Sequence, residues 1–129
     1  MLIEICKWIQ TKYDIPDHRI LRDHFLLLPR LNPYIYQVQE SVTQEEAERY
    51  IIHRPGILIM GGDTINVLIE IDGSIHHWRH VKKKTARRNQ HYQDYGIPTI
   101  IADIEDLKSI NLTIEEYLDI ELRRICLSP

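Results

Sequence analysis

Residues 54–73, RPGILIMGGDTINVLIEIDG, decide the fold of this 129-residue chain. Two apolar runs rich in β-branched residues flank the tetrapeptide Gly61-Gly62-Asp63-Thr64. Glycine and aspartate between such runs are typical of a tight β-hairpin. Counting back symmetrically from the turn places Gly56 opposite Ile69 or Glu70. The sequence therefore predicts an antiparallel pair of strands at the centre of the protein.

Two acids, Glu70 and Asp72, alternate with isoleucines at the end of the second run. Side chains two residues apart lie on the same face of a strand, so both carboxylates project from one side while the isoleucines enter the core. Paired carboxylates suit hard cations such as Mg²⁺. Outward acids are also common on half-exposed strands. A metal site and a solvated edge strand therefore remain alternative interpretations of this pair.

The segments outside the hairpin predict helices and two further strands. Apolar spacing, capping boxes and turn residues predict helices over 2–12, 18–28, 44–53, 81–95 and 114–125, and strands over 33–39 and 98–104. This order predicts an α/β (α+β) fold with a mixed β-sheet flanked by helices. We expect a single domain, 1–129, with an N-terminal helical pair in 1–30 and a core in 31–129.

Composition excludes several classes of protein. The chain is 43% hydrophobic and 27% charged, as in soluble globular proteins. No apolar run approaches the ~20 residues that span a bilayer, and the N-terminus lacks the features of a signal peptide. We therefore expect a cytoplasmic protein without a membrane partner. Cys6 and Cys126 form no metal-binding pair, so buried free thiols are expected, with one disulfide between them as the alternative.

A basic segment stands out from the acidic background of the chain. Residues 74–96 contain six lysines and arginines against one acid, whereas the whole chain has a net charge of −3. Such a stripe suits a phosphate-binding face, although a solvated helix face is also common. The candidate nucleic-acid ligands are Arg79, His80, Lys82, Lys83, Lys84, Arg87 and Arg88.

Three histidines follow the acids, and they are assigned separately. His76 and His80 lie four residues apart, as in a zinc pair, but no third ligand with zinc spacing follows. A dedicated zinc site is therefore disfavoured. His77 is expected at the surface.

The stretch RPGILIMGGDTINVLIEIDGSIHH, with the helix that follows it, resembles the core of PD-(D/E)XK nucleases. It is most similar to the very-short-patch-repair-type endonuclease branch. The shared pattern is E-x-D-G-x-x-H, here from Glu70 to His76, then a helical Arg88 and Gly96. The resemblance covers about residues 54–103, and it implies a restriction-endonuclease-like fold and metal-dependent hydrolysis of DNA.

The resemblance also implies roles for single residues. Glu70 and Asp72 would hold Mg²⁺ or Mn²⁺, and His76 would move a proton or position the water. One lysine of the run 82–84, assigned as Lys84, would stabilise the charge of the transition state, although the sequence does not choose among the three. The basic residues would bind the DNA backbone, and cutting both strands of a duplex favours a homodimer.

Departures from the family pattern leave a second hypothesis open. Gly56 stands where the family has a metal-binding Asp, and nothing in the sequence separates a natural from an engineered glycine here. Asp63 lies at the hairpin tip, more than ~20 Å from Glu70, and cannot replace this ligand. The candidate substitutes are side chains that reach inward: His53, or an acid of the segment 44–53, either Glu45 or Glu48. Without one, the protein would be a catalytically weak or inactive DNA-binding or protein-interaction module.

Overall fold

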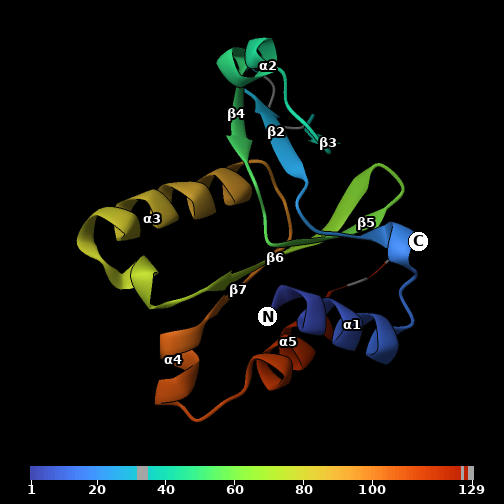
Figure 1. Cartoon of the computed structure of the whole chain (residues 1–129), viewed down its shortest axis with the longest axis vertical. Helices are drawn as coiled ribbons and strands as arrows, with labels where there is room; N and C mark the ends of the chain where they lie inside the picture. Colours follow the sequence, from blue (N-terminus) through green and yellow to red (C-terminus); the bar gives the residue numbers. More distant parts are fainter. Residues whose placement is uncertain (32–34, 126, 128–129) are drawn as a thin grey trace.

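The expected hairpin lies at the centre of the fold (Figure 1). The structure, a computed structural model, describes residues 1–31, 35–125 and 127. Strand β5 (Ile57–Gly61) pairs antiparallel with β6 (Thr64–Asp72), and Ile57 is the register partner of Ile69. Gly62 adopts φ +64° in the turn, a left-handed conformation that costs glycine little. The hairpin prediction is confirmed, and the register brings Gly56 next to Glu70.

A mixed four-stranded sheet is built on this hairpin, in the order β1-β5-β6-β7. Strand β1 (Ile20–Leu21) pairs antiparallel with β5, and β7 (Thr99–Asp103) pairs parallel with β6. Parallel strands need a long crossover connection, and helix α3 (Arg79–Asp94) lies in that connection. The predicted mixed sheet flanked by helices is therefore present.

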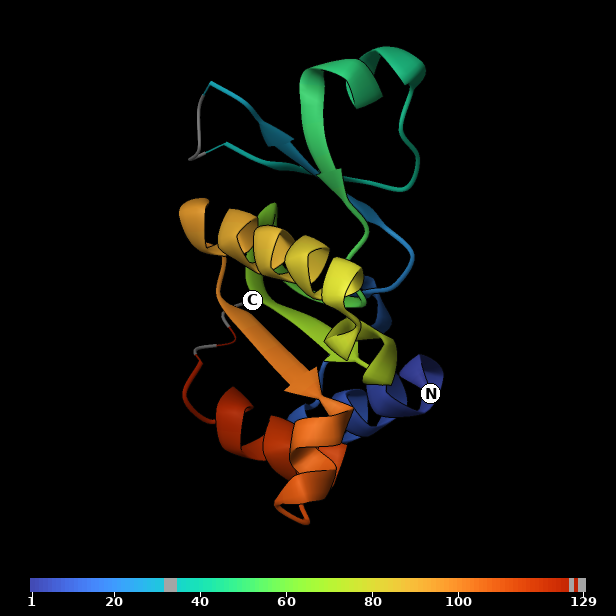
Figure 2. The same ribbon diagram turned by 90° about the vertical axis from the view of Figure 1, so that its left-hand side faces the viewer.

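Helices cover both faces of this sheet, with α3 on one side and α1 and α5 on the other (Figures 1 and 2). Helix α1 (Leu2–Tyr13) and helix α5 (Ile114–Leu122) pack on a core that includes Ile57 and Ile69. Leu68 instead belongs to the core beneath α3. Because side chains alternate along a strand, Glu70 and Asp72 continue the face of Leu68 and lie on the α3 side.

A second, smaller sheet has the strand order β3-β2-β4. It corrects the prediction of an N-terminal helical pair, because β2 occupies part of the second predicted helix. The predicted helix over 18–28 is wrong, because this segment forms a 3₁₀ turn, β1 and most of β2. Its run FLLL is apolar on both faces of β2, where Leu26, Leu27 and Leu28 are all buried and Leu26 and Leu28 join the core beneath α3. The bounds are β2 (Phe25–Pro29), β3 (Gln37–Gln39) and β4 (Tyr50–His53).

The other elements follow local capping signals. The capping boxes at Thr43 and Thr113 are both present, but α2 ends at Arg49, and the rest of its predicted length forms β4 against β2. Asp103 ends β7 and caps a short helix that the sequence reasoning missed. The remaining bounds are η1 (Asp17–Arg19), α2 (Gln44–Arg49), η2 (Ser74–His77) and α4 (Ile104–Ser109).

Cys6 is a buried free thiol, as expected. Cys126 lies outside the described residues, and so does Tyr34 of the predicted strand over 33–39. Among the residues described, none of the helices is long and apolar enough to cross a membrane.

Candidate acidic site beneath helix α3

Glu70 and Asp72 lie side by side on the α3 face at the end of β6. Their residues are only 7% and 3% exposed, and β6 is an internal strand between β5 and β7. A buried carboxylate is costly unless it is paired or hydrogen-bonded. The solvated-edge interpretation of this pair is therefore wrong, and the partners of the two acids decide what the site can do.

Arg88 is the main partner of Asp72. Its Nη2 donates to Asp72 Oδ2 at 2.7 Å and its Nη1 donates to Oδ1 at 3.2 Å, while its Nε lies 3.5 Å from Glu70 Oε2. A bidentate fork of this kind is the strongest pairing that arginine makes with a carboxylate. Burial opposes the charge of Arg88, but the hydrogen bonds to Asp72 and the two carboxylate charges outweigh it, so its pKa lies above the ordinary value.

Glu70 accepts hydrogen bonds at both carboxylate oxygens. The backbone N–H of Gly56 donates to Oε1 at 2.9 Å, and the hydroxyl of Tyr92 donates to Oε2 at 2.8 Å. Burial raises the pKa of Glu70, and the charge of Arg88 and these two donors offset only part of the rise. Burial and the adjoining carboxylate likewise raise the pKa of Tyr92. The sequence reasoning did not find Tyr92 as a hydrogen-bond donor, because the carboxylate that it contacts is 22 positions away.

Gly56 contributes its backbone to the site. A Cβ atom at this position would lie 3.1 Å from the carbonyl oxygen of Ile69 and 3.4 Å from Glu70 Oε1. The first distance is tighter than ordinary van der Waals contact, so a side chain here would press on the strand that carries the acids. At the position of the family's Asp, this chain supplies an N–H donor to Glu70.

His76 lies at the edge of the same cluster, as predicted. Its Nδ1 is 2.7 Å from Thr85 Oγ1, and its Nε2 is 3.6 Å from Asp72 Oδ1. Thr85 therefore orients the imidazole. The contact joins η2 to α3, so His76 is held on two sides by residues of the candidate site.

A cavity of about 460 Å³ is rich in cationic and imidazole side chains, and its lining includes Arg88 and His76, the two partners of Asp72. None of the acids that the structure describes lines it. Of the three lysines in the run, Lys84 reaches this cavity, whereas Lys82 lines a different hollow. The lining residues are His53, His76, Val81, Lys84, Thr85, Arg87 and Arg88.

His53 reaches the cavity from β4, in the smaller sheet. Its Nε2 lies 2.8 Å from Nδ1 of His91, and its ring packs edge-on against Tyr92. Burial lowers the pKa of His53 to about 4, with the charges of His91 and Arg88 acting in the same direction. The sequence suggested His53 as a neighbour of the acids, but it missed His91 as the partner.

The predicted nucleic-acid ligands all belong to α3. All of them except Arg88 are exposed, and Trp78 at the start of the helix is 57% exposed. Arg88 is the exception because its guanidinium faces the acids. The exposed members are Arg79, His80, Lys82, Lys83, Lys84 and Arg87.

The acids of α2 do not supply the missing ligand. Glu45 pairs with Arg49 at 2.8 Å on the exposed side of the helix. Glu48 lines a separate hollow with Pro29 and Tyr50. Helix α2 itself lies at the end of the molecule away from α4 and α5 (Figure 2). The expectation that one of these two acids reaches inward is therefore wrong.

The donor chemistry of Glu70 and Asp72 suits a hard divalent cation, because such ions prefer carboxylate oxygens. The two acids are adjacent and share one face of a strand. Among the described residues, no buried side-chain nitrogen or oxygen lacks a hydrogen-bond partner. The acids therefore fit a cation in ligand type, but Arg88 already supplies a positive charge to them.

A second group, His77, Asp103 and Asp106, has ligand atoms within 4.8 Å of one another. His77 Nε2 lies 2.8 Å from Asp103 Oδ2, and this contact raises the pKa of the exposed imidazole. Asp103 Oδ1 accepts from the backbone N–H groups of Glu105 and Asp106 as the cap of α4. Ion pairing and capping already account for this group, which the sequence reasoning did not find.

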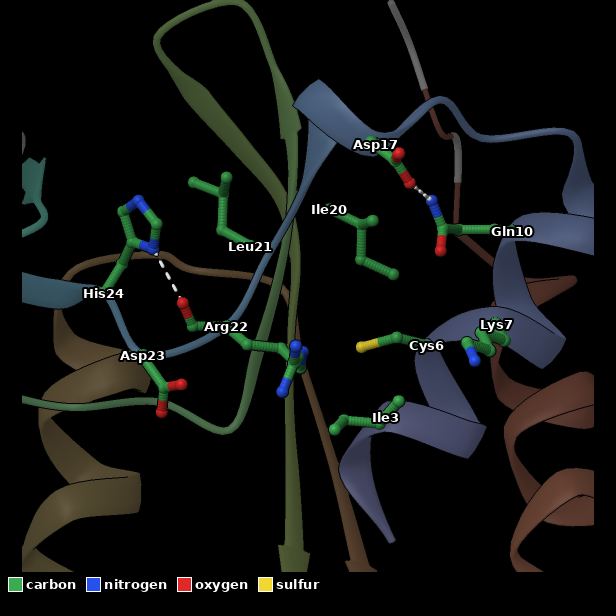
Figure 3. Close-up of a pocket in the computed structure, with 10 residues that line it drawn as sticks. All are labelled: Ile3, Cys6, Lys7, Gln10, Asp17, Ile20, Leu21, Arg22, Asp23 and His24. Carbon is green, nitrogen blue, oxygen red and sulfur yellow. Dashed lines mark hydrogen bonds between the residues drawn. The ribbon is translucent and has the colours of Figure 1, made fainter.

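A hollow of about 360 Å³ lies on the other side of the sheet, between α1 and the segment from η1 to His24 (Figure 3). Its lining mixes both signs of charge, and Asp17 accepts a hydrogen bond from Gln10. Arg22 points toward Cys6 (Figure 3). A mixed lining of this kind favours neither a cation nor a phosphate, unlike the cavity beside α3.

Comparison with known proteins finds no family model, no curated protein and no solved structure that matches this chain.

Proposed function

We propose that this protein is a metal-dependent DNA endonuclease that hydrolyses phosphodiester bonds. One observation carries the proposal: the buried acids Glu70 and Asp72 contact Arg88, which lines a cavity together with further cations of the exposed basic helix α3. Hydrolysis of a phosphodiester needs anionic ligands for a cation and cationic groups for the phosphate. The resemblance of residues 54–103 to PD-(D/E)XK nucleases agrees with this arrangement.

In this proposal Glu70 and Asp72 hold Mg²⁺ or Mn²⁺. A bound cation of this kind offsets the charge of the phosphate and makes a coordinated water more acidic. Gly56 and Tyr92 fix the Glu70 carboxylate through their hydrogen bonds. His76, oriented by Thr85, positions the water or accepts its proton.

The cations of α3 bind the substrate. Lys84 and Arg87 face the cavity, where they stabilise the negative charge that develops on the phosphate. The other exposed basic residues contact the DNA backbone, which fixes the register of the duplex without reading its sequence. Such binding weakens steeply with salt.

A cleavage assay tests the proposal. Wild-type protein should nick supercoiled plasmid in Mg²⁺ or Mn²⁺ and not in EDTA. Glu70→Gln should lower cleavage at least ~100-fold and leave the DNA affinity measured in EDTA within about twofold, because Glu70 is buried and does not line the cationic cavity. Lys108→Ala, an exposed basic residue on α4, is the control and should cut normally. Metal-independent nicking, or equal activity in Glu70→Gln, would contradict the proposal.

A second candidate function is DNA binding without efficient cleavage. Gly56 removes one carboxylate from the expected ligand set, and Arg88 neutralises one of the two that remain. Loss of a ligand lowers metal affinity and activity about 10-fold or more. The basic face of α3 would then serve binding alone.

Gly56→Asp separates the two candidates. Under the endonuclease proposal, the added carboxylate raises Mg²⁺-dependent cleavage above the wild-type rate, at a cost of about 1 kcal/mol because its Cβ presses on Ile69. Gly56→Asn has the same size without the charge and should give no gain. No cleavage by any version, with no Mg²⁺ binding by calorimetry, would favour the binding module.

Under this proposal the protein binds DNA as its partner and acts in the cytoplasm. Cutting both strands of a duplex in one encounter takes two sites, so a homodimer on DNA is part of it. Sedimentation of the protein with a short duplex tests this part, and one protomer per duplex would contradict it.

A further inference from the structure

We infer that Arg88 is an exchangeable counter-cation, which leaves the acids for a nucleic-acid phosphate and thereby couples metal binding to DNA binding. The inference rests on the proposed function and assigns Arg88 a regulatory role in the same site. Its consequence is that the DNA-free protein binds a divalent cation weakly.

The first step is the place that the guanidinium occupies. Both oxygens of Asp72 accept from Arg88, and the Nε of Arg88 lies 3.5 Å from Glu70 Oε2. The three side chains are mostly buried, with Arg88 15% exposed. Arg88 therefore holds the position of a cation between the two carboxylates.

The second step is competition between charges. A cation bound to Asp72 would lie within a few ångströms of the guanidinium, in surroundings where water screens poorly. The two carboxylates and the guanidinium together carry one net negative charge. A divalent ion added to these three groups would change this to a net positive charge. Arg88 and the divalent ion therefore each weaken the hold of the acids on the other.

The third step is an alternative partner for the guanidinium. Arg88 also lines the cavity of about 460 Å³, together with Lys84 and Arg87. A phosphate in that cavity would offer the same paired oxygens that Asp72 offers now, and arginine binds both groups with the same fork. Phosphate binding would draw the guanidinium away from Asp72 and free its oxygens.

Thermodynamic linkage makes this exchange reciprocal. If DNA raises the affinity for the metal by some factor, the metal raises the affinity for DNA by the same factor. Factors of roughly 5 to 150 are typical of coupled sites.

Two binding measurements test the exchange without any cleavage assay. Electron paramagnetic resonance measures Mn²⁺ affinity in the DNA-free protein. Fluorescence anisotropy measures the affinity for a short duplex in EDTA and in Ca²⁺. Wild type should bind Mn²⁺ weakly and bind the duplex at least ~10-fold more tightly in Ca²⁺ than in EDTA. Arg88→Met should bind Mn²⁺ at least ~10-fold more tightly than wild type and lose most of the effect of Ca²⁺ on DNA affinity.

Arg87→Met is the matched control. Arg87 lines the same cavity but has no contact with the acids among the described interactions. This variant should bind DNA more weakly, keep the wild-type Mn²⁺ affinity and keep the effect of Ca²⁺.

Folding is monitored in parallel, because Arg88→Met leaves Asp72 without its partner. Arg88→Lys keeps the charge and loses the fork, so it should show a smaller gain in Mn²⁺ affinity than Arg88→Met. If Arg88→Met folds only when Mn²⁺ is added, the metal has replaced the guanidinium, and the inference is supported. If every folded variant binds Mn²⁺ no more tightly than wild type, or Ca²⁺ acts equally on all of them, the inference is overturned.

The two proposals fail in different ways. If wild type cuts DNA and Glu70→Gln does not, while the Arg88 variants keep wild-type Mn²⁺ affinity, only the role of Arg88 is lost. If wild type cuts no DNA and Glu70→Gln leaves Mn²⁺ affinity unchanged, the metal-dependent function itself is lost.

Discussion

At the scale of single residues, the candidate site is held together by side chains that belong to distant parts of the chain. Tyr92 lies on the buried face of α3 and donates its hydroxyl hydrogen bond to Glu70. Gly56 reaches the same carboxylate from the loop before β5. The acids are thus held by a helix and a loop that meet only when the sheet has formed.

Tyr92→Phe tests this support. The ring packing stays, but Glu70 loses one of its donors in a buried place, so the free energy of unfolding should fall by about 1–3 kcal/mol. Urea denaturation measures the change. Tyr117→Phe removes a hydroxyl from a half-buried residue and should stay within about 0.5 kcal/mol of wild type. Equal effects of the two variants would show that the hydrogen bond to Glu70 contributes nothing.

His53 predicts a pH dependence of stability. Its pKa is about 4 in the folded protein, chiefly because it is buried, against 6.5 in an exposed histidine. Between these values the unfolded chain binds more protons, so stability falls as the pH drops from 6.5 toward 4. The full shift corresponds to about 3 kcal/mol, and about 2 kcal/mol is expected over that window because His53 is partly exposed and solvent screens its charge.

Urea denaturation of wild type and His53→Gln between pH 7.5 and 4.5 measures this pH-dependent contribution of His53 to stability. The glutamine does not titrate, so the stability of the variant should fall less steeply over this range. A difference between the two proteins that stays constant with pH would contradict the prediction.

At the scale of elements, the sequence predicted what local signals determine. The hairpin follows from its turn glycines and alternating runs, and the two capping boxes begin helices where Thr43 and Thr113 predict them. The helix predicted over 18–28 fails because FLLL forms β2, a strand whose side chains are buried on both faces. Helical spacing and a doubly covered strand give the same apolar run, and only tertiary packing separates them.

The candidate site shows the same division. Glu70, Asp72 and His76 could be found because they are close in sequence and their spacing carries a pattern. Tyr92 as a donor and Asp103 as the partner of His77 could not, since those contacts span 22 and 26 positions. The pair of Arg88 with Asp72 spans 16 positions, and it forms only because α3 packs over β6.

Helix α4 depends on its cap, which also pairs with His77. Asp103→Ala removes the acceptor of two backbone N–H groups, so unfolding should become easier by about 1 kcal/mol. Asp103→Asn keeps a good cap and should cost less. In both variants the pKa of His77 should fall, because the Asp103 hydrogen bond is the largest cause of its rise. Urea denaturation and an NMR titration check the two effects, and an unchanged His77 pKa would contradict the pairing.

At the scale of the whole molecule, the charges are sorted by face. The chain has a net charge of −3, yet the outer side of α3 carries six exposed basic or histidine residues that the sequence had proposed for DNA. Long-range attraction to DNA is therefore weak over most of the surface and concentrated near the cavity. This distribution predicts that binding depends on where a positive charge lies, and not only on the total charge.

Two double variants with the same change in net charge test that statement. Lys84→Ala with Arg87→Ala removes two cations that line the cavity, so the slope of log K for DNA against log salt should become shallower by about 1.8, because each phosphate contact contributes ~0.9. Lys7→Ala with Lys108→Ala removes two exposed cations from α1 and α4 and should leave the slope unchanged. Fluorescence anisotropy with a short duplex over a tenfold range of KCl measures both slopes. If both pairs changed the slope equally, net charge alone would govern binding, and this result would contradict the proposal that α3 forms the DNA-binding face.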